Sequence, residues 1–360
     1  MHPVLPEPKC SGNPFSIMYP HSQQPALAKT VIFQTKAWKQ PFSPQAGKQE
    51  DEIMTSVTDI TPKGYRIAPH EHSRRLQVVT LQADTIAEFI RQTERFPVQA
   101  LEYKPFNRFR VAEILDSLCE YTLGKFLLGT LKNRATGAFL LKFEGGDKKD
   151  TDFFVKLGTA VSHLIGRPNF DAMSQKYYAR FTVRNVDNSD SYLRQPHRRM
   201  ELHNDGTFVD EPTDYVLMMK MQEENMQGGN SLILHLDDWA ELDKFYNHPI
   251  AKKPITWEAP PSKNVTQSIE HPVFIDNDPN GRPRLHFIDQ FAKPKNREEG
   301  LYLFELGESL ENDPNFVSVR VEVGDMLVVE NHNWLHGRDK FVAHPDLLRE
   351  LMRQRGQFVA

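Results

Sequence analysis

The sequence contains the stretch Glu201-Leu-His-Asn-Asp-Gly-Thr207, which places a histidine and a carboxylate two residues apart. In a strand, residues i and i+2 point to the same face, so His203 and Asp205 can converge on one ion as the chain enters an Asn-Asp-Gly turn. A His-x-Asp pair with one distant histidine forms a 2-His-1-carboxylate triad, which binds Fe(II) and leaves coordination positions open. Open positions indicate chemistry, because a structural metal site fills its shell with protein ligands.

The second histidine is expected in the later stretch Asn331-His-Asn-Trp-Leu-His-Gly-Arg338. His336 and His332 have the same strand parity, so both are candidates. The glycine after His336 would let a ligand approach closely, which favours His336. A single histidine in such a run is more often a hydrogen-bonded core residue, and the chain has 14 histidines and 48 acidic residues.

Composition limits the classes of protein that fit this chain. Its 360 residues are 39% hydrophobic and include 23 phenylalanines, enough for a sizeable core. A net charge of −4 provides no basic field for nucleic acid, and we find no transmembrane span or secretory signal. The two cysteines, Cys10 and Cys119, lie far apart, which argues against a disulfide framework. These features predict a soluble, cytoplasmic protein.

The chain divides into an extension and a domain. Residues 1–56 are proline-rich, with eight prolines before residue 51, and we expect them to be flexible. Residues 57–360 are expected to form a single domain, with helical support at about 81–166 and a strand-rich core at about 175–360.

Helical and strand periodicities separate along the domain. The apolar spacing predicts helices over 83–96, 109–131 and 151–165, and Asp237-Asp-Trp239 is expected to open a short helix. Strands are predicted over 177–186, 215–221, 231–236, 284–291, 317–323, 326–331 and 351–359. Helices followed by many strands indicate an α+β fold, with a jelly-roll (double-stranded β-helix) core and flanking N-terminal helices.

Two further motifs suggest anion binding. In a C-terminal strand, Arg349, Leu351, Arg353 and Arg355 would share one face, and guanidinium groups there could hold organic acids bidentately. An amphipathic helix from about Asp346 with solvated arginines fits the same pattern equally well. The Gly228-Gly229 turn leads into a strand and would place the Ser231 hydroxyl where it could donate to an anion.

The chain also resembles a known family. The matching stretches cover about residues 57–358 and include 96–104, 163–167, 169–173, 185–198, 201–207, 214–220, 225–231, 259–265, 334–339 and 344–356. By these stretches the sequence is similar to the Fe(II)/2-oxoglutarate-dependent dioxygenases of the taurine dioxygenase and clavaminate synthase type. Within them it most resembles the carbon-starvation-induced glutarate 2-hydroxylases.

The resemblance implies a role for each motif. Iron would be held by His203, Asp205 and His336. Arg349, assisted by Ser231, would pair with the far carboxylate of 2-oxoglutarate, and Arg353 would meet the acid group of the substrate. Arg355 is additional to the broader pattern and could serve either ligand.

The activity implied is Fe(II)- and O2-dependent hydroxylation of glutarate to L-2-hydroxyglutarate, with release of succinate and CO2. This would be a step of lysine and glutarate catabolism, carried out by a homotetramer. The alternatives are a related dioxygenase acting on another small acid, such as a sulfonate or a betaine, a non-catalytic 2-oxoglutarate-sensing barrel, and a zinc hydrolase with the same ligands.

Overall fold

The structure is a computed structural model that describes residues 62–185, 196–259, 263 and 265–359. The expected proline-rich extension, 1–56, lies outside the described residues.

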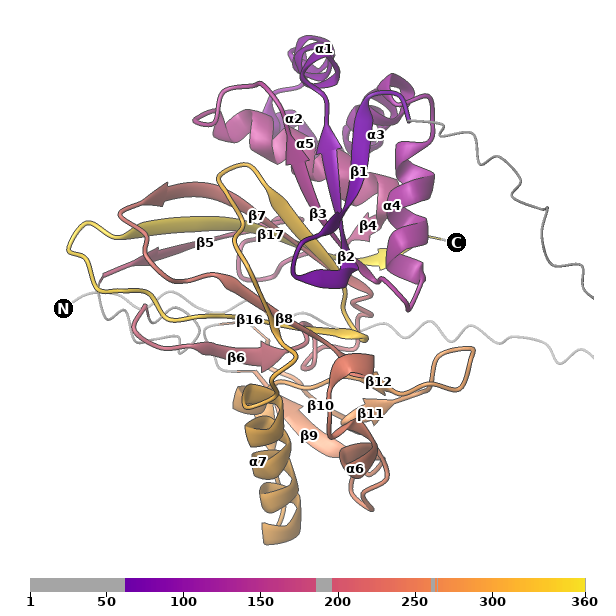
Figure 1. Cartoon of the computed structure of the whole chain (residues 1–360), viewed down its shortest axis with the longest axis vertical. Helices are drawn as coiled ribbons and strands as arrows, with labels where there is room; N and C mark the ends of the chain where they lie inside the picture. Colours follow the sequence, from indigo (N-terminus) through magenta and orange to yellow (C-terminus); the bar gives the residue numbers. More distant parts are fainter. Residues whose placement is uncertain (1–61, 186–195, 260–262, 264, 360) are drawn as a thin grey trace, which may run out of the picture. The chain divides into compact units, whose positions relative to one another are not determined.

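Helices cluster in two parts of the described chain (Figure 1). The first group is α1 (Ala83–Thr93), α2 (Val98–Tyr103), α3 (Pro105–Leu118), α4 (Leu123–Lys132) and α5 (Thr151–Ile165). The second group is α6 (Leu242–Tyr246) and α7 (Arg297–Glu311), with the 3-10 turns η2 (Leu236–Asp238) and η4 (Asp289–Phe291).

The predicted helices agree with the structure to different degrees. Helix α5 has the predicted bounds, and Asp150 caps it by accepting a hydrogen bond from the backbone N–H of Phe153 at 2.9 Å. The single helix predicted over 109–131 is wrong, because the chain turns between α3 and α4 at Glu120 and Tyr121, where φ is 52° and 58°. The predicted short helix after Asp237 is a 3-10 turn followed by α6.

One large sheet carries most of the strands, in the order β1-β2-β3-β15-β7-β17-β4, with β5 also paired to β17. All neighbours are antiparallel except β2 and β3. The strands are β1 (Tyr65–His70), β2 (Ser73–Leu81), β3 (Ala138–Phe143), β4 (Gly166–Pro168), β5 (Ala179–Arg184), β7 (Tyr215–Glu224), β15 (Met326–Glu330) and β17 (Leu348–Phe358).

A second, four-stranded sheet has the order β14-β8-β16-β6. Its strands are β6 (Met200–His203), β8 (Ser231–His235), β14 (Val317–Val319) and β16 (Trp334–Arg338). Smaller sheets contain β9 (Ile255–Glu258), β10 (Ser268–His271) and β13 (Ala292–Lys293), and β11 (Phe274–Ile275) with β12 (Arg284–Leu285).

The strand predictions located the central strands but not all of the edges. The segments predicted over 215–221, 231–236 and 326–331 correspond to β7, β8 and β15. The strand predicted over 284–291 is wrong beyond Leu285, since the chain there turns through η4. The strand predicted over 317–323 ends at Val319.

Alternating side chains let the large sheet bury both of its faces. On β7, Leu217 and Met219 pack in the core that contains the buried side chains of α1, α3, α4 and α5. Val216 and Met218 point the other way and pack with Ile233 of the small sheet. The two sheets therefore face each other.

The outer face of the small sheet packs against a third core. Leu232 and Leu234 of β8 and Leu335 of β16 contact buried residues from the segment 236–310, including Leu306 of α7. Figure 1 shows α6, α7 and β9–β12 together on this side. The small sheet is thus packed on both of its faces.

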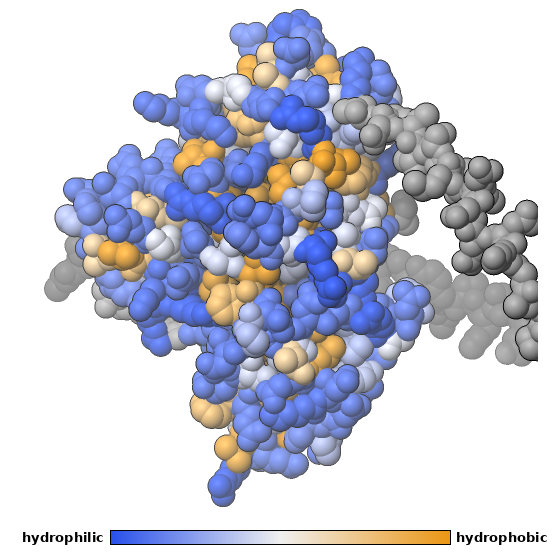
Figure 2. Space-filling model, in the orientation of Figure 1, coloured by the Kyte–Doolittle hydropathy of each residue, from blue (hydrophilic) through white to orange (hydrophobic). Residues whose placement is uncertain are grey.

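Polar side chains cover most of the face seen in Figure 2, with hydrophobic residues in separate patches. Among the described residues, no helix combines the length and apolar character needed to cross a membrane.

Candidate metal centre

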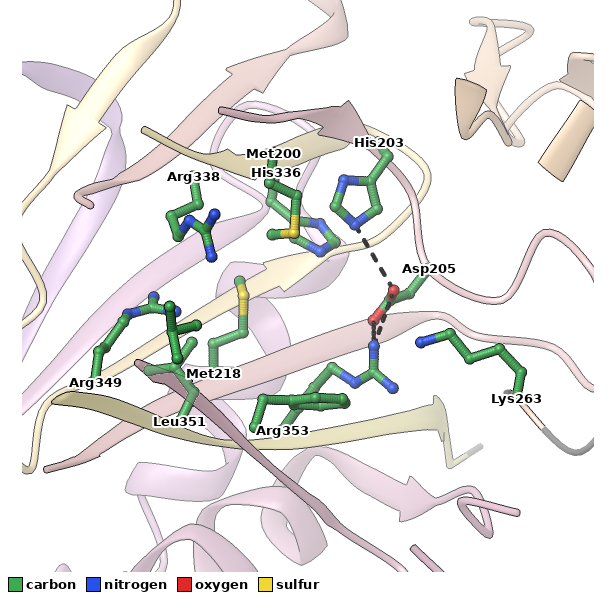
Figure 3. A pocket seen from close by; sticks show the side chains of 12 residues that line it. Met200, His203, Asp205, Met218, Lys263, His336, Arg338, Arg349, Leu351 and Arg353 are labelled. Atoms are coloured by element: carbon green, nitrogen blue, oxygen red, sulfur yellow. Dashed lines mark hydrogen bonds and ion pairs between the residues drawn. The ribbon is translucent and has the colours of Figure 1, made fainter. Parts of the chain in front are cut away.

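The structure brings His203, Asp205 and His336 together between the large sheet and the small, four-stranded sheet. One ligand atom from each residue lies within 4.8 Å of the others, and all three side chains are buried. His203 on β6 and His336 on β16 are cross-strand partners, with ring centroids 4.4 Å apart. Figure 3 shows both rings and the Asp205 carboxylate directed toward one space. Antiparallel pairing therefore joins histidines 133 positions apart in the sequence.

Two buried amides hold the loops that carry these side chains. Asn204 donates to the backbone carbonyl of Trp334 at 3.2 Å and accepts from the N–H of Phe287 at 2.9 Å. Asn331 accepts from the N–H of Asp205 at 2.9 Å and donates to the carbonyls of Asp205 and Thr213 at 2.9 and 2.8 Å. Because the amides link the loop after β6 to the loop before β16, they fix the carboxylate relative to the distal histidine.

The donor atoms suit a divalent metal. The Nδ1 of His203 lies 2.7 Å from the carbonyl of Glu201, and an Nδ1–H donor there leaves Nε2 available as a ligand. Within the described residues, Nδ1 of His336 is buried without a hydrogen-bond partner. Burial lowers the pKa of His336 to about 3, so its ring is neutral at ordinary pH. A neutral imidazole is the form that binds metal.

The rival histidine lies elsewhere. His332 packs edge-on against His286, with ring centroids 5.3 Å apart, and it does not belong to the three-residue group. Burial lowers the pKa of His332, as expected for a core histidine. Gly337 was predicted to let a ligand approach, but it has a packing role instead. A Cβ there would lie 2.5 Å from the carbonyl oxygen of Met200, so the glycine lets β6 approach β16.

Asp205 also contacts a cation from the opposite sheet. Nη1 of Arg353 on β17 lies 3.1 Å from Oδ2 and donates to Oδ1 at 3.2 Å. Burial raises the pKa of Asp205, but the positive charges of Arg353 and, secondarily, Arg355 outweigh it and hold the pKa well below its usual range. Asp205 is therefore ionised, as a metal ligand must be.

The arginine row lies on a strand, so the helical alternative is wrong. Arg349, Leu351 and Arg353 of β17 face the metal-binding residues, while Met352 points into the helix-covered core. The row ends with Arg355, which is on the same face. The alternation of β17 therefore delivers three guanidinium groups to one side of the sheet.

Two pockets meet at Asp205, Arg353 and Lys263. Pocket A (Figure 3) lies between the sheets and is lined by Phe181, Val183, Met200, His203, Asp205, Met218, Lys263, His336, Arg338, Arg349, Leu351 and Arg353. Pocket B lies on the other side of these shared residues, and its lining includes Phe170, Asp171, Glu211, Phe291 and Arg355.

Two buried arginines mark the far end of pocket A. The guanidinium carbons of Arg338 and Arg349 lie 4.8 and 5.9 Å from the ring centroid of Phe341. Among the described residues, Nε of Arg349 has no hydrogen-bond partner. Burial, and secondarily the charge of Arg338, lower the pKa of Arg349 to about 9. The charge at this end of the pocket suits an anion.

Ser231 begins β8, where it pairs with Arg338 of β16 and follows the predicted Gly-Gly turn. It shares the inter-sheet side of β8 with Ile233. The described residues that line pocket A do not include it.

Sequence reasoning missed four charged residues of the pockets. Arg338 lies two positions after His336 and could have been found from strand parity. Asp171, Glu211 and Lys263 come from irregular segments whose return to the site follows from no local pattern.

Comparison with solved structures identifies the fold. The fold is that of the non-heme iron oxygenases. An asparagine oxygenase solved with Fe(II), 3-hydroxyasparagine and succinate superposes with a TM-score of 0.64 at 16% identity, covering 78% of this chain and 93% of that one. The non-heme iron oxygenase OrfP, solved with Fe and alpha-ketoglutaric acid, gives 0.56 at 14% identity, over 77% and 94%.

Sequence comparison is more specific. The chain belongs to the CsiD family, whose model matches residues 65–358. It is 58% identical to a glutarate 2-hydroxylase of Salmonella paratyphi B over 309 residues, 85% of this chain and 95% of that protein. It is 59% identical to a glutarate 2-hydroxylase of Klebsiella pneumoniae over 296 residues, 82% of this chain and 91% of that protein.

Proposed function

We propose that this protein is an Fe(II)- and 2-oxoglutarate-dependent dioxygenase that hydroxylates glutarate to L-2-hydroxyglutarate. The observation that carries the proposal is the buried group of His203, Asp205 and His336, which lies between arginines at opposite ends of two connected pockets. The family membership and the names of the relatives support glutarate as the substrate.

The three side chains would hold iron on one face and leave the pocket side open. Iron held there, with 2-oxoglutarate and O2, would supply the oxidative decarboxylation to succinate and CO2 that is coupled to hydroxylation of glutarate at C2. The protein contributes orientation, since arginine clamps fix the acid groups and thereby place C2 near the metal.

The pockets suggest how the arginines divide the work. We assign Arg349 and Arg338, with Ser231 behind them, to the distal carboxylate of 2-oxoglutarate in pocket A. We assign Arg353 and Arg355 to glutarate, because Arg355 lines pocket B, away from Arg349. We therefore do not assign Arg355 to the binding of 2-oxoglutarate.

The architecture proposed is a double-stranded β-helix, formed by the two facing sheets, with the N-terminal helices α1–α5 as support. We propose residues 57–360 as a single domain, and Thr58–Ala360 does cluster as one compact unit. From the family resemblance we further propose a cytoplasmic homotetramer acting in lysine degradation. Size-exclusion chromatography with light scattering tests the tetramer.

The activity is tested with an oxygen electrode and succinate quantification. Iron, 2-oxoglutarate and glutarate together should consume O2 and release succinate in equal amounts. Faster turnover with a sulfonate or a betaine than with glutarate would show that glutarate is not the preferred substrate. Visible absorbance from an anaerobic iron–2-oxoglutarate complex without O2 consumption would indicate a sensing barrel instead.

A matched pair of variants tests the division of the arginines. Arg353→Leu should weaken glutarate binding, by about 2–4 kcal/mol for a desolvated ion pair, more than 2-oxoglutarate binding. Arg349→Leu should do the reverse. The measurement is the KM of each acid in each variant. A larger loss of 2-oxoglutarate affinity in Arg353→Leu would reverse the assignment.

A further inference from the structure

A buried carboxylate shares the arginines that we assign to the substrate. Oδ2 of Asp171 lies 3.3 Å from Nη2 of Arg353 and 3.9 Å from Nη2 of Arg355. The Asp171 side chain is buried and belongs to the lining of pocket B. An acid at this position is unexpected in a pocket for a dicarboxylate, because like charges repel.

The local backbone fixes this carboxylate in place. Oδ1 of Asp171 accepts a hydrogen bond from the N–H of Ser174 at 2.9 Å, and its own N–H donates to the carbonyl of Lys176 at 2.7 Å. Burial raises the pKa of Asp171, but Arg353 and the hydrogen bond from Ser174 outweigh it, so the pKa lies below its ordinary value. Asp171 is a fixed negative charge beside the arginine pair.

The charges of the residues at this end of pocket B determine how much negative charge a bound acid end should carry. Arg353 and Arg355 carry two positive charges. Asp171 cancels one of them. Asp205 also pairs with Arg353, but the proposed iron would offset its charge. Glu211 and Lys263, which also line the pocket, have opposite signs. One positive charge therefore remains, and it matches a single carboxylate.

We propose that Asp171 is a specificity-determining residue that limits the acid end of the substrate to one negative charge. The proposal rests on the proposed function. Asp171 would disfavour a dianionic end by repulsion, which is discrimination through an unfavourable contact with the wrong ligand. A carboxylate end would pair with the arginines that Asp171 orients.

The test compares acids of equal chain length as competitors of glutarate. 4-Sulfobutyrate and 4-phosphonobutyrate both have tetrahedral ends, but at about pH 8.5 the phosphonate has two charges and the sulfonate one. Inhibition constants would be measured with the iron-loaded enzyme, for wild type and for Asp171→Asn, whose amide oxygen can still accept from Ser174. The Asp171→Asn change should improve phosphonate inhibition relative to sulfonate inhibition by at least fivefold.

Two controls separate the possible failures. Glu350→Gln also removes a carboxylate bound to an arginine, since Glu350 pairs with Arg180, but neither residue lines the pockets, so the ratio should not change. An unchanged 2-oxoglutarate affinity in Asp171→Asn shows that pocket A is intact. If wild type does not hydroxylate glutarate, the proposed function fails. If it does, and the ratio in Asp171→Asn changes less than fivefold, the role of Asp171 is refuted.

Discussion

Asp205 is the residue on which both halves of the site depend. It faces the histidines of the small sheet and pairs with Arg353 of the large one, and its backbone is held by Asn331. A carboxylate with these partners can supply charge to a metal and at the same time orient Arg353, the arginine that we assign to the substrate.

We therefore expect Asp205→Ala to abolish iron binding and succinate release together, because the change removes one of the three proposed ligands and the only negatively charged one. The measurements are anaerobic iron titration and succinate quantification. Asp289→Ala serves as a control, since Asp289 is an acid in the vicinity of His203 that is not in the three-residue group. Turnover that persists in Asp205→Ala would contradict the assigned ligands.

At the residue scale, strand parity and turn chemistry located His203 and Asp205, because the two residues are close in the sequence. Parity alone did not separate His336 from His332, and the family resemblance indicated His336. Sequence reasoning could not divide the arginines, since their roles depend on which side of Asp205 each lies in space. Asp171 was missed for the same reason. It reaches the site through contacts with β17, 182 positions away in the sequence in the case of Arg353.

The loops next to β6 and β16 form the element that positions the metal. Asn331→Ala removes three buried hydrogen bonds between them, so we expect a loss of about 2–4 kcal/mol of stability and a tenfold to hundredfold loss of metal affinity, as is typical for groups that support ligands. Urea unfolding and metal titration measure the two effects. Asn312→Ala, at an exposed position, should change neither appreciably, and equal effects would show that the Asn331 network is not specific.

The end of β15 carries a carboxyl group with a pH-dependent effect on stability. Glu330 accepts backbone hydrogen bonds from His332 and Asn333 at 3.2 and 2.7 Å, and burial raises its pKa to about 7. Because this pKa exceeds the unfolded value of about 4.5, the stabilisation is fully present below that value and is lost as the pH rises through about 7.

Wild type should therefore lose about 2 kcal/mol more stability than Glu330→Gln between pH 5 and pH 8. Urea unfolding of the metal-free proteins at both values is the measurement. The glutamine retains an acceptor for the two N–H groups, so the difference isolates the charge. Parallel pH dependence in the two proteins would contradict a raised pKa.

At the element scale, sequence patterns predicted α5 and the central strands, because α5 has apolar residues at helical spacing and the strands are short apolar runs that are largely buried. Helix α7 went unnoticed, although Asn296 with Glu299 forms a capping pattern and Tyr302, Leu306 and Leu310 are buried at helical spacing. The break between α3 and α4 depends on two residues with positive φ, neither of them glycine, so no local sequence pattern indicated it.

For the molecule as a whole, ligands should stabilise the fold in two separable steps. Binding of Mn(II), used in place of iron so that 2-oxoglutarate is not consumed, should raise Tm, and binding of 2-oxoglutarate should raise it further. At one hundred times Kd each would contribute about 2.7 kcal/mol. Arg349→Leu should keep the first increment and lose most of the second, and chelation should reverse both. Thermal unfolding followed by circular dichroism distinguishes these outcomes.

The ligand histidines stand on one sheet and the arginine row on the other, with Ile233, Leu327, Val329 and Trp334 among the residues packed in the layer between. The thickness of this layer sets the distance between the two sheets, and we expect it to limit how many methylene groups fit between a clamped acid end and the reacting carbon. Altering a filler side chain far from the metal would then change which homologous diacid reacts, and at which carbon, with every polar contact left in place.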